Sequence, residues 1–156
     1  MKNAFTIVEL LITLSITSLL FLGIYNLYSY NFKAFHKAEE LNIAVDIANN
    51  FKEEILSKPL KSSFENIPES DNENNFRINF NTAFDYNNYN SQAADIFGNS
   101  IDAYNNFYVK ILVKKVVPDK YNNIVNTVSD SGYASVSITV FKNKKSLIDL
   151  PFVMTE

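Results

Sequence analysis

The chain lacks the residues from which most active sites are built. Its 156 residues include no cysteine, one histidine and three glycines. Without cysteine there is no disulfide bond, and a single histidine cannot form an ordinary zinc site. The glycines form neither a G-x-S-x-G motif nor a phosphate-binding loop. The sequence therefore supports no catalytic residue, cofactor or metal site, and we expect the single histidine, His36, to be a surface or interface residue.

Positive charge is also scarce. Acidic side chains outnumber basic ones by 17 to 14, which gives a net charge of −3, and removal of Lys2 would make the chain more acidic. Proteins bind nucleic acid largely by neutralising its phosphates with lysine and arginine side chains. Nucleic acid is therefore not an expected partner.

A long run near the start of the chain, from Leu10 to Phe32, has no charged side chain. About 20 apolar residues are enough for a helix to cross the hydrocarbon core of a bilayer, so this run predicts a single-pass membrane helix. The carboxylate of Glu9 stands at its start, where a charge in lipid costs about 2 kcal/mol or more and is normally kept for a partner or a function. A secretory signal peptide would carry an A-x-A cleavage site after its apolar core, and none follows here.

The order Ala4, Phe5, Thr6 and Glu9 before this helix closely resembles the type III signal peptide of type IV pilins and pseudopilins. The resemblance implies that a prepilin peptidase cuts between Ala4 and Phe5 and methylates the new amine, with alanine in place of the more usual glycine. Thr6 and Glu9 would belong to the assembly motif, in which Glu9 neutralises the amino group of Phe5 on a neighbouring subunit as a filament forms. An ordinary membrane anchor with an incidental glutamate is the alternative.

The resemblance also implies partners and a location. The partners would be other pilin or pseudopilin subunits, the prepilin peptidase, an inner-membrane platform with its assembly ATPase, and membrane lipid before assembly. The chain would be a single-pass protein of the cell membrane with an extracytoplasmic globular domain, and after assembly it would lie in a cell-surface filament. A pilus, a secretion pseudopilus and a DNA-uptake filament all remain open.

Two features favour a minor subunit. The glycine and proline that commonly loosen the apolar helix of major pilins are replaced at the corresponding positions by Ser18 and Asn26. The segment Ala38 to Pro59 is similar to the A-x-x-x-A-x-x-x-x-E-E-I/L pattern of V-type minor pilins and I-type minor pseudopilins. The absence of cysteine also excludes the C-terminal disulfide loop found in many type IV pilins.

Helical periodicity continues beyond the membrane run. Lys58-Pro59 should end the helix, because the residue before a proline is driven out of the helical region, so we predict one helix from Phe5 to about Ser57. The expected parts are a leader (1–4), the apolar half of the helix (5–32), its amphipathic half (33–58) and a β-sheet domain (59–156). Apolar residues at three-and-four spacing define one face of the amphipathic half, which we expect to pack on the globular domain: Ala34, Ala38, Leu41, Val45, Ala48 and Ile55, with Ala44, Ile47 and Phe51 flanking it.

The rest of the chain alternates like β-structure. We predict a turn at 142–145, a short helix near Ser91 to Ile96, and an edge position for the last strand because Pro151 lacks a backbone donor. The fold class is therefore α+β and pilin-like, with a long N-terminal helix packed on a C-terminal antiparallel sheet. Strands are predicted at Phe76–Phe80, at Phe107 to about Pro118, at Ala134–Val140 and at Ile148–Met154.

Two loop regions leave alternatives open. The acidic residues Glu69, Asp71 and Glu73 are either calcium ligands or part of a solvated loop. The loop 81–106 is rich in asparagine and tyrosine, which suits an adhesin or other binding module displayed on a filament or membrane. The alternative is that the tyrosines in and just after this loop are ordinary core and loop aromatics: Tyr86, Tyr89, Tyr104 and Tyr108.

Overall fold

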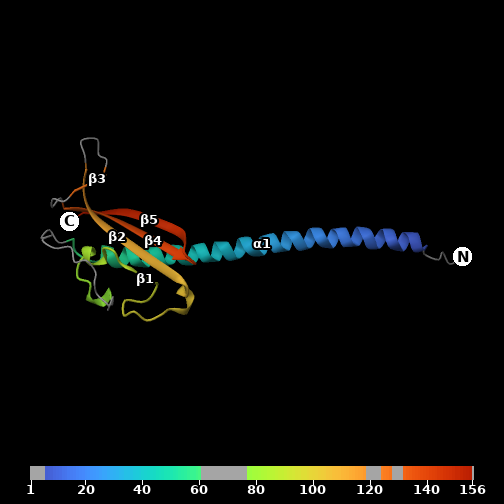
Figure 1. Ribbon diagram of the computed structural model, residues 1–156, viewed down its shortest axis with the longest axis horizontal. Coiled ribbons are helices and arrows are strands. Elements are labelled where there is room, and N and C mark those ends of the chain that lie inside the picture. The colour runs from blue at the N-terminus through green and yellow to red at the C-terminus, as the bar shows by residue number, and fades with distance from the viewer. Residues whose placement is uncertain (1–5, 61–76, 119–123, 128–131, 156) are drawn as a thin grey trace. The chain divides into compact units, whose positions relative to one another are not determined.

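The computed structural model describes residues 6–60, 77–118, 124–127 and 132–155 (Figure 1). The chain divides into two units, Met1–Glu40 and Leu41–Glu156. One long helix is followed by an antiparallel sheet, which confirms the predicted α+β class and its pilin-like architecture. The elements in chain order are α1 (Ile7–Leu56), the 3₁₀ helices η1 (Arg77–Asn79) and η2 (Ala83–Tyr86), β1 (Asn90–Gln92), η3 (Asp102–Tyr104), β2 (Phe107–Pro118), β3 (Ile124–Asn126), β4 (Tyr133–Lys142) and β5 (Lys145–Thr155).

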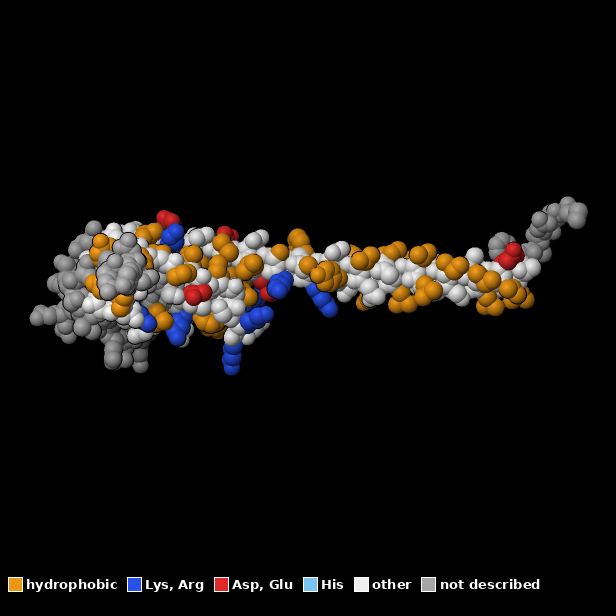
Figure 2. Space-filling model, turned by 90° about the horizontal axis from the view of Figure 1, so that it is seen from above, with side chains coloured by type: hydrophobic (Ala, Val, Ile, Leu, Met, Phe, Trp, Pro, Cys, Tyr) orange, Lys and Arg blue, Asp and Glu red, His pale blue; other side chains and the backbone are white. Residues whose placement is uncertain are grey.

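In the first unit the structure describes the N-terminal part of α1. Its large apolar side chains are exposed, from Ile7 to Phe35, and none of the most apolar 18-residue window is buried. Figure 2 shows hydrophobic side chains distributed along this part of the helix on the face in view. By length and composition α1 can cross a membrane. The apolar surface of this unit is left uncovered by the described part of the chain.

The second unit is built around a sheet with the strand order β1-β2-β4-β5, and β3 pairs with the far end of β2. All of these pairs are antiparallel. Strands β2 and β4 are in register from Phe107 opposite Lys142 to Lys115 opposite Ala134. Alternate residues of both strands enter one core with the C-terminal part of α1, which therefore covers that face of the sheet. The helix contributes Ala44, Ile47, Ala48, Phe51 and Ile55 to this core.

The hairpin between β4 and β5 confirms the predicted turn. Asn143 and Lys144 have φ angles of 51° and 64°, the left-handed pair that a two-residue type I′ turn requires. Strand β5 lies at the edge of the sheet, as Pro151 indicated, and Pro151 itself is exposed.

Two predicted elements are wrong. Of the expected strand Phe76–Phe80, Phe76 lies outside the described residues and Arg77–Asn79 form η1 instead. A 3₁₀ turn places Arg77 and Phe80 three residues apart on one side, and both are buried.

The helix expected near Ser91 to Ile96 is also wrong, because Asn90–Gln92 form strand β1. The edge of β2 offers this segment ladder partners. The amide of Ala93, just beyond β1, donates to the carbonyl of Phe107 at 2.8 Å.

Candidate functional site

The start of α1 is closed by a reciprocal contact between Thr6 and Glu9. The amide and the hydroxyl of Thr6 each donate to Oε2 of Glu9 at 3.0 Å, and the amide of Glu9 donates to Oγ1 of Thr6 at 3.3 Å. This is a capping box, in which the residue before the helix and the third helical residue satisfy each other's amides. The helix therefore has a defined first turn directly after Thr6.

The capping box gives Glu9 a hydrogen-bond partner in its own chain, whereas the sequence analysis named only the amino group of a neighbouring subunit. Thr6 provides that partner, and its signal was present in the sequence as T-x-x-E before an apolar run. Ala4 and Phe5, the predicted cleavage residues, lie outside the described residues.

Four serine and threonine hydroxyl groups in the first part of the apolar segment also form hydrogen bonds within the helix. They donate to carbonyls one turn earlier, as between Ser18 and Leu14 at 2.7 Å. An unsatisfied polar group in hydrocarbon is costly, so these bonds make the segment compatible with lipid. The same pattern holds for Thr13, Ser15 and Thr17.

A group of aromatic side chains in contact with one another follows on α1. The rings of Phe32 and His36 meet edge to face at 4.3 Å between centroids, and Nδ1 of His36 lies 3.4 Å from Oε2 of Glu39. His36 is exposed, as expected for a surface residue.

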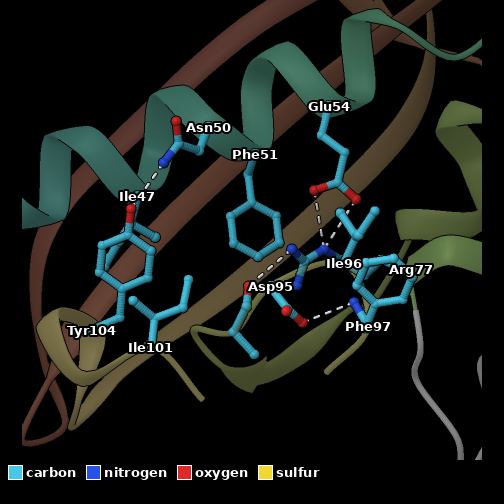
Figure 3. A pocket seen from close by; sticks show the side chains of 11 residues that line it. Ile47, Asn50, Phe51, Glu54, Arg77, Asp95, Ile96, Phe97, Ile101 and Tyr104 are labelled. Carbon is cyan, nitrogen blue, oxygen red and sulfur yellow. Dashed lines mark hydrogen bonds and ion pairs between the residues drawn. The ribbon is translucent and has the colours of Figure 1, made fainter. Parts of the chain in front are cut away.

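A second polar centre lies in the core of the second unit and was not predicted. Arg77 of η1 is 4% exposed, and its Nε donates to Oε1 and Oε2 of Glu54 on α1 at 3.1 and 3.2 Å (Figure 3). Its Nη2 donates to the carbonyl of Ala94 at 2.9 Å, and its Nη1 to the hydroxyl of Tyr89 at 3.3 Å. The hydroxyl of Tyr86 donates to Oε1 of Glu54 at 2.7 Å. One carboxylate therefore connects α1 to two separate segments of the loop region.

The interactions in this centre favour a protonated Arg77 guanidinium and a protonated Tyr86 phenol. Burial lowers the pKa of the Arg77 guanidinium, but Glu54 and, to a smaller extent, Tyr89 together outweigh burial and leave that pKa above its usual value. Burial, and then the Glu54 carboxylate, raise the pKa of the Tyr86 phenol. The Arg77 guanidinium also lies over the Phe51 ring, 4.2 Å from its centroid. These groups therefore pair with one another.

A pocket of about 260 Å³ lies beside this centre. Asn50 donates from Nδ2 to the hydroxyl of Tyr104 at 2.9 Å at one end of it, and Asp95 binds the amides of Phe97 and Asn99 at the other. Figure 3 shows these side chains between α1 and the segment that follows β1. Because its polar groups pair with one another, the pocket is a packing feature of the helix and loop.

This cluster was not predicted from the sequence, because its members are far apart in the chain. Glu54 and Arg77 are 23 residues apart, and Glu54 and Tyr86 are 32 apart. Arg77 stood in a segment that alternated like a strand, and nothing in the local pattern paired it with α1.

The four tyrosines predicted to be either part of a binding surface or ordinary core and loop aromatics differ in their burial. Tyr86 and Tyr89 are buried at 0% and 3% exposure, so they are core residues, and a recognition surface that includes them is wrong. Tyr104 is half-buried, whereas Tyr108 is exposed. The acidic residues Glu69, Asp71 and Glu73 lie outside the described residues, within which no group of histidine and acidic side chains could hold a metal ion.

Comparison with known families gives one match, at the N-terminus. Residues 1–25 match the family described as the prokaryotic N-terminal methylation motif, which is the hallmark of type IV pilins and pseudopilins. No curated protein and no solved structure matches the chain significantly. The motif spans Thr6, Glu9 and the first turns of the exposed apolar helix.

Proposed function

We propose that this chain is a minor type IV pilin or pseudopilin, a structural subunit that prepilin peptidase processes and that assembles into a pilus or a secretion or DNA-uptake pseudopilus. The observation that carries the proposal is the methylation motif at residues 1–25, which continues into a capped and uncovered apolar helix. Such a motif points to a structural subunit and not to an enzyme.

The exposed apolar surface of α1 supports assembly. Large apolar areas on a folded protein are normally covered by a partner or by lipid. Membrane lipid would cover this helix before assembly, and the helices of other subunits would replace the lipid in the filament. An inner-membrane platform and an assembly ATPase would drive that transfer from the membrane.

The capping box gives Thr6 and Glu9 distinct roles in this proposal. After a cut between Ala4 and Phe5, the new amine would stand one residue before Thr6. Thr6 would donate hydrogen bonds to the Glu9 carboxylate while the subunit is in the membrane before assembly. The methylated ammonium of Phe5 on the neighbouring subunit would then pair with Glu9, which neutralises two charges inside the filament.

The continuity of α1 supports a minor subunit. The helix runs unbroken through Ser18 and Asn26, where major pilins commonly carry a glycine and a proline. The proposed parts of the chain remain a leader (1–4), an apolar half-helix (5–32), an amphipathic half-helix (33–58) and an extracytoplasmic sheet domain (59–156).

Mass spectrometry of the N-terminal peptide, from cells with an active prepilin peptidase, tests the processing step. We expect a chain that starts at N-methylated Phe5. A start at Met1, or a cut after the apolar run, would contradict the proposal. Cells without the peptidase provide the control and should yield the unprocessed chain.

Assembly is tested separately by Glu9→Ala. We expect this variant to be processed and to remain in the membrane, but to be lost from sheared filaments. Glu39→Ala, which removes an exposed carboxylate from the same helix, is the matched control and should assemble normally. Equal incorporation of the two variants would remove Glu9 from the assembly mechanism.

A further inference from the structure

The outer face of the sheet carries a hollow that the assembly proposal does not use. Its volume is about 570 Å³, which lies within the ~300–1,000 Å³ of typical ligand sites. It lies where β1, the start of β2 and the β4–β5 turn come together. The residues that line it are Asn90, Asn106, Tyr108, Lys110, Phe141, Asn143 and Lys144.

Two aromatic rings form the apolar part of the hollow. Tyr108 of β2 stands opposite Phe141 of β4 in the ladder, so their side chains are neighbours on one face. Tyr108 is 48% exposed, whereas Phe107 and Val109 beside it are buried at 1% and 0%. The core does not require this aromatic pair, because β2 turns its other face to the core.

Three amides surround the rings. Asn90 stands opposite Lys110 across β1 and β2, and Asn106 and Asn143 occupy left-handed turn positions with φ angles of 66° and 51°. Asparagine adopts this left-handed conformation more readily than most residues do, and both turn residues line the hollow. Each amide offers both a donor and an acceptor, which is the combination that sugar hydroxyls require.

The charge of the hollow is positive, although the protein carries a net charge of −3. Lys110 and Lys144 line it without any acidic side chain, and within the described residues neither lysine forms an ion pair. Asp149, an acid on the same face, lies on β5, where its Oδ1 accepts hydroxyl bonds from Ser137 at 2.7 Å and Thr139 at 3.2 Å. The lysines are therefore available to an anionic ligand.

We propose that this hollow binds a carboxylated oligosaccharide, such as a chain of uronic acids. The rings of Tyr108 and Phe141 would pack against the C–H face of a pyranose, the amides would bind its hydroxyls, and Lys110 and Lys144 would pair with its carboxylates. Nucleic acid fits less well, because its affinity comes mainly from phosphate neutralisation and the hollow offers more amides than cations. This inference goes beyond the assembly proposal and does not depend on it.

Binding can be measured with the full chain in detergent micelles, using fluorescently labelled oligogalacturonate, oligomannuronate and hyaluronan oligosaccharides. We expect at least one of them to bind saturably and to weaken as salt is raised, while neutral maltohexaose and a twelve-residue oligothymidylate bind at least about tenfold more weakly. Absence of binding to all three, equal binding of the neutral sugar, or tighter binding of the oligothymidylate would each overturn the proposal.

Variants locate the site. Lys110→Gln and Lys144→Gln should each weaken binding about tenfold, since each removes a charge-assisted hydrogen bond, and Tyr108→Ala should weaken it by a similar factor. Lys114→Gln is the matched control, because Lys114 is exposed on the same face of β2 but does not line the hollow. If Lys110→Gln and Lys114→Gln bind alike, the hollow is not the site.

Discussion

Two of the glutamates on helix α1, Glu9 and Glu54, obtain hydrogen-bond partners for their carboxylates in different ways. Glu9, in the first unit, is bound by Thr6 only three residues away. Glu54, in the second unit, is bound by Arg77 and Tyr86, which lie 23 and 32 residues along the chain. The first contact can form in an isolated helix turn, whereas the second requires the folded domain.

The apolar residues of the two units show the same difference. In the first unit they are exposed along the helix, and in the second the helix residues facing the sheet are buried. A domain that buries its own apolar face needs no partner to cover that face, while an uncovered apolar helix needs lipid or other subunits to cover it. Changes at Glu54 should therefore affect folding, and changes near Glu9 should affect only the helix start and assembly.

The largest stability effect is expected from Glu54→Ala. The substitution leaves the buried Arg77 guanidinium without its carboxylate, so we expect a loss of about 3 kcal/mol in the free energy of unfolding. Thermal unfolding of the detergent-solubilised chain, followed by near-UV circular dichroism, would measure it. Glu53→Ala, at the exposed neighbouring position, should change stability by less than about 0.5 kcal/mol. Similar losses in both variants would show that the pair does not stabilise the domain.

Tyr86→Phe should cost less, about 1.5 kcal/mol at pH 7, because Glu54 keeps Arg77 but loses one hydrogen bond. Burial, and then Glu54, raise the pKa of Tyr86, so the folded protein holds this proton to a higher pH than the unfolded chain does. The contribution is fully present below the ordinary tyrosine pKa of about 10 and is lost as pH rises above it.

Unfolding measured from pH 8 to 11.5 checks this sign. The wild-type protein should lose stability above about pH 10 more steeply than Tyr86→Phe does, so the gap between the two should narrow. Tyr108→Phe, at an exposed position, is the control for the loss at pH 7 and should change stability by less than about 0.5 kcal/mol. Parallel curves for the wild type and Tyr86→Phe would rule out a role for this phenol in the alkaline loss.

Thr6→Ala should have a smaller and strictly local effect. Loss of the capping box costs about 1 kcal/mol at the start of α1, so amide hydrogen exchange should accelerate in the first helical turn. Unfolding of the second unit should not change. Thr17→Ala, inside the helix, is the control and should leave exchange in the first turn as it was. Faster exchange throughout α1 would contradict a local cap.

The smallest effect is expected from Lys144→Gly, and it has the opposite sign. Lys144 adopts a φ of 64°, which a side chain disfavours and glycine accepts, so stability should rise by roughly 0.5 kcal/mol. Lys142→Gly, inside β4, is the contrasting variant and should destabilise the domain. A loss of stability in Lys144→Gly would mean that its side chain contributes more than the turn strain costs.

Much of the fold could be predicted because its signals are local. The uncharged run from Leu10 to Phe32 indicated the exposed apolar helix, and alternation from Phe107 to Val113 indicated strand β2. Pro151 indicated the edge strand, and Asn143 marked the turn. The signal for the cap, T-x-x-E at Thr6 and Glu9, is also local, but the capping box itself was not predicted.

Periodicity and residue chemistry thus determined the fold class, the apolar helix and its N-terminal motif, because each depends on neighbours within a few positions. The tertiary structure decided that Arg77–Asn79 form a 3₁₀ turn, that Asn90–Gln92 form a strand, and that Tyr86 is buried. These outcomes depend on partners such as Glu54 and the edge of β2, which only the folded chain brings within hydrogen-bond distance. A short segment takes the conformation that satisfies its polar groups against such partners, so its own pattern was not enough to predict it.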